Sequence, residues 1–289
     1  ILLLYPPSKD DKTREILFIR KSDNHTKVWE GEKLSKKQAN ELSGIDSIYF
    51  IDDFKDILSS IATKVDTFYI NKNEHYRANS PVETREDRFI SWLLKNYPAH
   101  NVAKSNPILQ RQRSIKHPDE IDQIKKACDI TRKGFNRVLK FIKPDVWEYE
   151  IEAEFIHEFI NSSSKGFAYS PIIASGDDNN VLHYIKNNNQ CKSGELILMD
   201  VGAEYGNYSS DMTRTVPVSG KFSKRQKEIY NAVLRVKNEA TKLLTVGNNW
   251  KIFHEQVGEI MTKELLEVRL IDKNDIKNPV SYTHLRAHE

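Results

Sequence analysis

Hydrophobic positions divide the first part of the chain into short apolar runs and longer amphipathic stretches. The runs ILLLY, EILFIR, SIYFID and TFYIN predict strands, and SKKQANEL, DFKDILSSIATK and REDRFISWLLKNY predict helices. Ser35 and Asp53 stand before two of these helices, where a short polar side chain can cap the first turn. Trp29 falls in a predicted loop, where we expect partial burial. The alternation predicts an α/β domain over residues 1–104.

A polar, proline-containing stretch follows, and we expect residues 105–117 to link this domain to a second one over residues 118–279. Pro118 suits the first turn of a helix, and Asp119 and Glu120 follow it at the positive end of the helix dipole. The side chains that we expect this helix to bury are Ile121, Ile124, Cys128, Phe135, Val138, Leu139 and Ile142.

The remaining pattern predicts a second helix, an irregular segment, a strand hairpin and two further helices. The second helix runs from about Trp147 to Asn161, and the last two begin at a Ser223 cap and near Asn249. The irregular segment reads GFAYSPIIASGDDNNVLHY. Residues 280–289 continue no periodicity, and we expect them not to be native to the domain.

The hairpin, ELILMDVGAEYGNYSSDMTRTVPV, carries one aspartate on each strand. If its turn is centred between Tyr205 and Gly206, opposed residues have numbers that sum to 411, so Asp200 faces Asp211. Opposed Cβ atoms lie about 4.5–5.5 Å apart, and like charges in that position are destabilising. The pattern therefore predicts either that one carboxylate takes up a proton or that a cation lies between the two, and a divalent metal fits best. The alternative is a pair of solvated aspartates on an exposed hairpin.

Two further residues could support such a metal site. His183, in NNVLHYIKN, could stabilise a developing oxyanion or bind a substrate carbonyl; alternatively, it is a packed strand histidine. Thr213 lies two residues beyond Asp211 and so on the same face, where a hydroxyl could orient a metal-bound carboxylate, or merely favour a strand. His254 flanks an apolar helix stripe, and we expect it to be structural, because HEQVG lacks the second histidine of a zinc-protease motif.

Bulk properties narrow the class of protein. A length of 289 residues suggests about two domains, and a net charge of +3, evenly spread, is too mild to indicate nucleic-acid binding. No apolar run approaches the ~18 residues of a membrane span, so we expect no membrane partner. Cys128 and Cys191 lie far apart, which favours a reduced, cytoplasmic protein. The chain begins without Met inside a predicted strand, so we expect its true start to be missing.

Several stretches resemble one known family. IIASGDDNNVLHY and GELILMDVGAEYGNYSSDMTRTVPVSGKFSKRQKEIYNAV resemble the first half of the catalytic domain of Xaa-Pro aminopeptidase (aminopeptidase P). The resemblance rests on the histidine, the first aspartate, the second aspartate eleven residues later, and the TRTVPVSGKF that follows. KHPDEIDQIKKACDIT resembles the first helix of that domain, and the α/β unit with VWEGEKLS resembles the family's N-terminal domain.

The resemblance implies an α/β N-terminal domain of the creatinase/aminopeptidase P N-terminal type and an α+β pita-bread catalytic domain, truncated. It implies a hydrolase with two divalent metal ions, Mn²⁺ first among them, that releases the N-terminal residue from peptides with proline in second position. By this resemblance Asp200 and Asp211 are metal ligands, and His183 contacts the substrate near the scissile carbonyl. We also expect a homo-oligomer at full length.

The family takes one His and two Glu ligands, one Glu acting as general base, from a second half that we expect to be missing here. The chain would then be inactive alone. Prolidase, which prefers dipeptides, and a non-enzymatic pita-bread binding module remain alternatives. Methionine aminopeptidase normally lacks the N-terminal domain, and creatinase has substitutions at the positions of Asp200 and Asp211.

Overall fold

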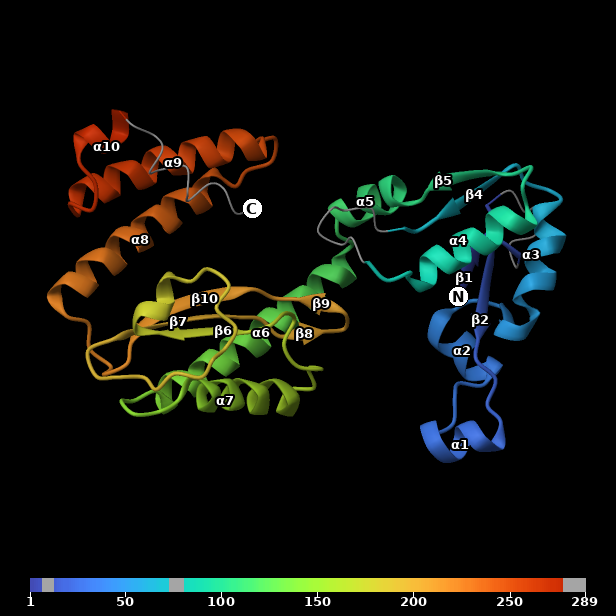
Figure 1. Cartoon of the computed structure of the whole chain (residues 1–289), viewed down its shortest axis with the longest axis horizontal. Helices are drawn as coiled ribbons and strands as arrows, with labels where there is room; N and C mark the ends of the chain where they lie inside the picture. Colours follow the sequence, from blue (N-terminus) through green and yellow to red (C-terminus); the bar gives the residue numbers. More distant parts are fainter. Residues whose placement is uncertain (7–12, 73–80, 278–289) are drawn as a thin grey trace. The chain divides into compact units, whose positions relative to one another are not determined.

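The computed structural model describes residues 1–6, 13–72 and 81–277, which fall into two compact units, Ile1–Lys116 and His117–Glu289 (Figure 1). The expectation about residues 280–289 lies outside the described residues.

The first unit is an α/β unit. Its strands are β1 (Leu2–Leu4), β2 (Glu15–Ile19), β3 (Ser47–Phe50), β4 (Thr67–Ile70) and β5 (Asn101–Lys104). Strand β2 pairs antiparallel with β1 and parallel with β3, while β4 and β5 form a separate parallel pair. Its helices are α1 (Asn24–Glu30), α2 (Lys36–Ser43), the 3₁₀ turn η2 (Ile51–Asp53), α3 (Phe54–Ala62), α4 (Arg85–Asn96) and α5 (Asn106–Ser114). Its buried core contains Ile16, Phe18, Phe54, Leu58 and Leu93.

The sequence pattern predicted most of these elements but missed α1, β5 and α5. Ser35 caps α2 through a capping box with Gln38, as expected. Asp53 stands at the N-cap position of α3, but its carboxylate accepts from the Phe50 amide upstream instead. Trp29 lies on α1 rather than in a loop and is 76% exposed. Strand β5 and helix α5 were not expected, and α5 occupies most of the segment 105–117.

The second unit packs two helices against a sheet. Its elements are α6 (Pro118–Phe141), α7 (Glu148–Asn161), β6 (Ile172–Ser175), the 3₁₀ turn η4 (Gly176–Asn180), β7 (Leu196–Val201), β8 (Glu204–Tyr205), β9 (Tyr208–Ser209), β10 (Met212–Pro217), α8 (Lys224–Leu243), α9 (Trp250–Glu267) and α10 (Lys273–Lys277). The sheet has the order β10-β7-β6 and is antiparallel throughout. Helices α6 and α7 lie along one of its faces (Figure 1).

Strand β6 lies inside the segment that was expected to be irregular. All four of its side chains are buried, so the segment lacks the alternation that marks a half-exposed strand. Strand β7 does alternate: Ile197, Met199 and Val201 are buried in the core under the helices. Leu198 and Asp200 therefore point to the opposite face of the sheet.

The apolar stripe of α6 agrees with the predicted one at Phe135 and Val138 and differs from it at other positions. Its buried residues are Ala127, Ile130, Thr131, Gly134, Phe135 and Val138. Ile121, Cys128 and Leu139, which were expected inside, are exposed. Ala127, Thr131 and Gly134 are small or polar, so a pattern of large apolar residues does not identify them as buried. Their small side chains let α7 and the hairpin approach α6 closely.

Both cysteines are free. Cys128 is exposed, whereas burial raises the pKa of the Cys191 thiol to about 11. Among the described residues, none of the helices combines the length and the apolar character that crossing a membrane requires.

The contact of α6 with α7 yields a prediction about stability. A Cβ at Gly134 would lie 2.7 Å from Phe159 Cε1 and 2.9 Å from Phe155 Cδ1. We expect Gly134→Ala to destabilise the second unit by about 1–3 kcal/mol through overpacking, less the ~0.5–1 kcal/mol that alanine adds to helix stability. Urea unfolding followed by amide exchange in α6 and α7 measures the change. Asn136→Ala, on the exposed side of the same helix, is the control and should not destabilise; a more stable Gly134→Ala variant would contradict the prediction.

Candidate metal centre

The register of the hairpin corrects the expected pairing of the two aspartates. Gly206 and Asn207 both have positive φ angles, 60° and 66°, as a two-residue type I′ turn requires. The turn is thus centred one residue later than expected, and opposed residues have numbers that sum to 413. Asp200 faces Thr213, not Asp211, so the expected direct opposition of the carboxylates is wrong.

The correction moves the partner by two residues, which keeps the same side-chain face. Asp211 therefore stands diagonal to Asp200, a spacing across which side chains still reach one another. The Tyr169 hydroxyl lies 2.6 Å from Asp200 Oδ1 and 3.1 Å from Asp211 Oδ1. Both carboxylates thus approach one position, at the phenol oxygen.

Tyr169 is a site residue that the sequence pattern did not reveal. It lies just before β6, in the segment expected to be irregular. Burial is the largest cause that raises the pKa of its phenol, followed by the hydrogen bond to Asp200 and the negative charges of Asp200 and Asp211. The phenol is therefore neutral at ordinary pH and donates its single proton to the carboxylate pair.

A tight contact between backbone segments fixes the strands on either side of the pair. A Cβ on Gly202 would lie 1.8 Å from the carbonyl oxygen of Ser210 and 3.1 Å from the ring of Tyr169, so only glycine fits there. The amide of Ala203 lies 2.9 Å from Thr131 Oγ1 and 3.0 Å from Ser210 Oγ, and the two hydroxyls lie 2.6 Å apart. Since Ser210 directly precedes Asp211, this buried cluster anchors the second aspartate to α6.

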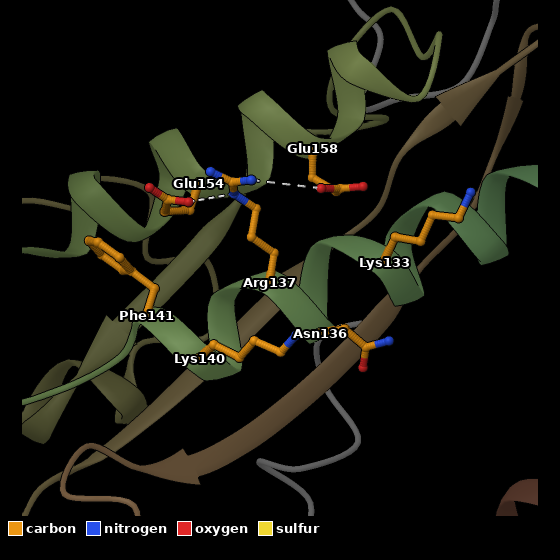
Figure 2. A pocket seen from close by; sticks show the side chains of 7 residues that line it. All are labelled: Lys133, Asn136, Arg137, Lys140, Phe141, Glu154 and Glu158. Carbon is orange, nitrogen blue, oxygen red and sulfur yellow. Dashed lines mark hydrogen bonds and ion pairs between the residues drawn. The ribbon is translucent and has the colours of Figure 1, made fainter.

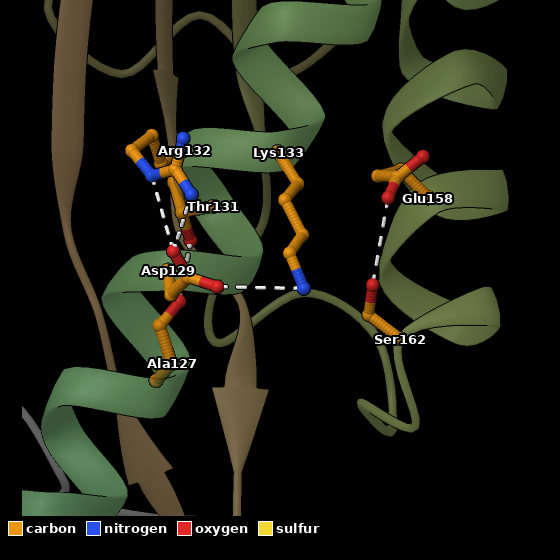
Figure 3. Close-up of polar contacts among 7 residues, drawn as sticks. All are labelled: Ala127, Asp129, Thr131, Arg132, Lys133, Glu158 and Ser162. Carbon is orange, nitrogen blue, oxygen red and sulfur yellow. Dashed lines mark hydrogen bonds and ion pairs between the residues drawn. The ribbon is translucent and has the colours of Figure 1, made fainter.

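Figure 3 shows how Thr131 is held on α6. Its hydroxyl lies 3.1 Å from the carbonyl oxygen of Ala127, one turn earlier. Asp129, on the outer surface of the helix, accepts from Arg132 and forms an ion pair with Lys133. One helical segment therefore has a solvated charged side and a buried polar side that receives the hairpin.

The hairpin tip also rests on α6. Tyr208 donates to Glu120 Oε1 at 2.7 Å, and the Lys126 ammonium lies 5.5 Å from the centre of the Tyr205 ring. The first half of α6 thus contacts the hairpin tip at Tyr205 and Tyr208. Thr131, further along the helix, contacts the hairpin at Ala203 and Ser210.

The other two predicted residues are placed differently. Thr213, opposite Asp200, is exposed on β10. His183 is exposed in a turn after η4, not packed in a strand. Its neighbour Tyr184 is buried against Ile172, which is paired with Asp200. The turn that carries His183 therefore contacts the sheet face that bears Asp200, although in the described part of the chain no hydrogen bond joins the imidazole to either aspartate.

The donor set fits part of a divalent metal site. Carboxylate oxygens are the ligands that Mg²⁺ and Mn²⁺ prefer, and Asp200 and Asp211 place two carboxylates close enough together to share the Tyr169 hydroxyl. Within residues 1–6, 13–72 and 81–277, no group of three or more His, Cys, Asp or Glu side chains is arranged to hold a metal. The described residues thus bring two carboxylates together, fewer side chains than a two-metal centre needs.

A groove of about 550 Å³ between α6 and α7 lies apart from these residues (Figure 2). Its lining residues are Lys133, Asn136, Arg137, Lys140, Phe141, Glu154 and Glu158. Arg137 reaches across it to Glu154 at 2.5 Å and to Glu158 at 4.0 Å. These ion pairs join the two helices across the groove. None of the predicted site residues lines it.

Comparisons with known proteins match each unit to a family model. Residues 122–288 match the model of the metallopeptidase family M24, and residues 1–69 match that of the aminopeptidase P N-terminal domain. The Xaa-Pro aminopeptidase of Haemophilus influenzae is 32% identical over 275 residues, which cover 95% of this chain and 61% of that protein.

Solved structures agree. Pseudomonas aeruginosa aminopeptidase PepP aligns with a TM-score of 0.85 at 27% identity, over 99% of this chain and 64% of that one. Zn-substituted E. coli aminopeptidase P in complex with product aligns with a TM-score of 0.81 at 27% identity, over 93% of this chain and 61% of that one. The predicted fold class is confirmed, and the chain spans about three fifths of the length of the relatives it matches.

The shared hydrogen bonds of Tyr169 yield a prediction about its titration. Asp200→Asn removes a negative charge that disfavours the phenolate and leaves only a weaker, neutral amide oxygen as acceptor, so we expect it to lower the pKa of Tyr169. The ¹³C chemical shift of the ring measures this pKa, with the signal assigned through Tyr169→Phe. Asp177→Asn removes one charge from η4 and should leave Tyr169 unchanged. An unaltered or higher pKa in Asp200→Asn would contradict the shared contact.

Proposed function

Because the chain belongs to metallopeptidase family M24, we propose that it takes part in the metal-dependent release of the N-terminal residue from peptides with proline in second position. The observation that carries the proposal is that Asp200 and Asp211 lie close enough on one face of the sheet to share the Tyr169 hydroxyl. The similarity to Xaa-Pro aminopeptidases over 95% of the chain supports the substrate class. A pair of carboxylates also agrees with the oxygen-rich ligands of a hydrolytic two-metal site.

In this proposal Asp200 and Asp211 are ligands of two divalent ions. Mn²⁺ suits the oxygen donors, and a relative of known structure carries Zn²⁺ in substituted form. When bound, such ions activate water and hold the substrate carbonyl. Tyr169 orients the two carboxylates by its hydrogen bonds, and Thr213 stands opposite Asp200, where its hydroxyl can restrict the orientation of that carboxylate.

His183 is the chain's candidate for contact with the substrate. Its exposure leaves both ring nitrogens accessible, and the turn that bears it contacts the sheet face of Asp200. A ring nitrogen that donates to the scissile carbonyl would stabilise the negative charge that develops on the oxygen. Such a donor acts on the transition state, so it contributes to turnover more than to metal affinity.

Two carboxylates do not fix the coordination of two ions, and a general base is also required. We propose that these groups come from a chain of the relatives' length, and that full-length copies associate into a homo-oligomer. The two free cysteines favour the cytoplasm as the compartment.

The proposal is tested by turnover with added Mn²⁺. We expect residues 1–289 not to hydrolyse a tripeptide with proline in second position, whereas a chain extended to the length of the relatives does so. The general base alone contributes about 10²–10⁴-fold. Comparable rates for the two chains would contradict the ligand assignment. Hydrolysis by the extended chain of Xaa-Pro dipeptides alone would favour a prolidase, and metal binding without turnover would favour a binding module.

A second prediction separates the role of His183 from that of the ligands. In the extended chain, His183→Ala should lower kcat/KM by about 10²–10³-fold, as loss of an oxyanion donor does, with metal content unchanged. Elemental analysis of the purified variant gives the metal content. Asp211→Asn, by contrast, should lose metal. If His183→Ala loses metal in the same proportion, His183 is a ligand and its proposed role is wrong.

A further inference from the structure

A fully buried carboxylate lies outside the candidate metal centre, at the first position of α7. Glu148 has no exposed surface. Its Oε1 accepts from the amide and the hydroxyl of Ser175, both at 2.7 Å. Its Oε2 accepts from the Tyr184 hydroxyl at 2.7 Å and from the Asn189 amide at 3.0 Å. Four hydrogen bonds from three separate segments thus end on one side chain.

These four donors are neutral groups, which makes Glu148 a structural acceptor rather than half of an ion pair with any of them. A buried carboxylate is tolerated when hydrogen bonds satisfy its oxygens, and the positive end of a helix dipole stabilises its charge further. Burial, and after it the hydrogen bond to Glu148, raise the pKa of Tyr184, so that its hydroxyl remains a donor. Glu148 therefore connects three segments: the end of β6 at Ser175, the turn that carries His183 and Tyr184, and the loop at Asn189.

A second carboxylate of α7, one turn later, holds the same loop. Glu152 accepts from the side-chain amide of Asn187 at 2.9 Å. The same amide group donates to the carbonyl of Pro171, and its oxygen accepts from the amide of Ile173 at 3.0 Å. Asn187 is buried and has a positive φ of 46°, a conformation that these contacts keep in place.

The anchored tyrosine connects this cluster with the metal centre. The ring of Tyr184 packs on Ile172, Ala174 and Leu198, all on the sheet face that bears Asp200. Its hydroxyl donates to Glu148, so the side chain is held both by the packing of the ring and by this hydrogen bond. His183 directly precedes Tyr184 and is exposed. Fixing Tyr184 therefore limits where the backbone can present the imidazole.

We propose that Glu148 is a positioning residue that, through Tyr184, holds the turn bearing His183 in one place over the sheet face of Asp200. The proposal rests on the function proposed above for His183. Glu148 itself touches neither substrate nor metal in this proposal. Without the anchor the turn would sample several positions, and a displacement of about 1 Å can lower a rate by about 10²-fold.

The first test uses residues 1–289 and needs no activity. Tyr184→Phe removes one hydrogen bond and keeps the buried ring, and Glu148→Gln keeps the shape but gives two donors an amide nitrogen in place of an acceptor. We expect both variants to exchange amide hydrogens faster over residues 181–189, with the hairpin 204–209 unchanged. Tyr97→Phe, which removes a phenol hydrogen bond to Ser59 in the first unit, is the matched control. Unchanged exchange over 181–189 in both variants overturns the proposal.

The second test uses the extended enzyme and a proline-second tripeptide. Tyr184→Phe should lower kcat about 10- to 100-fold with little change in KM, and Tyr97→Phe should not. In a His183→Ala background the effect of Tyr184→Phe should vanish, because the residue acts through the histidine. An undiminished effect in that background overturns the proposal. Faster local exchange together with a fully active His183→Ala variant supports the anchor and refutes instead the role proposed for His183.

Discussion

Two like charges on one sheet face need a framework that keeps them close against their repulsion. Here the framework is a backbone contact: Gly202 lies so near the carbonyl of Ser210 that no side chain fits between them. The buried hydroxyls of Thr131 and Ser210 then fasten the strands to α6 through the amide of Ala203. Because Asp200 and Asp211 flank this contact, its rigidity defines their separation.

The two faces of the sheet differ: one packs in the core and the other carries the candidate site. On one face Ile197, Met199 and Val201 pack with the aromatic side chains of α6 and α7, and burial of this apolar surface favours folding. On the other face Leu198 and Asp200 support the turn of His183 and the carboxylate pair. A strand alternates its side chains, so one six-residue segment serves both purposes.

Buried polar groups supply the connections that apolar packing cannot. Apolar contacts are non-directional, whereas hydrogen bonds specify distance and angle. Glu148, Thr131 and Ser210 are each almost completely removed from solvent, and each joins segments far apart in the chain. Such fully satisfied clusters hold the loops around the candidate site, where little regular structure exists to do so.

The sequence by itself determined the order of most elements, the family and the face on which the aspartates meet. Periodicity and caps are local, and a hairpin centre misplaced by one residue still preserves the face, because side chains repeat every two positions. Only the tertiary structure decided the register, the phase of the α6 stripe, strand β6, and the hydrogen bonds of Tyr169 and Glu148. These depend on contacts between distant segments and on burial of polar and small residues, which no local pattern records.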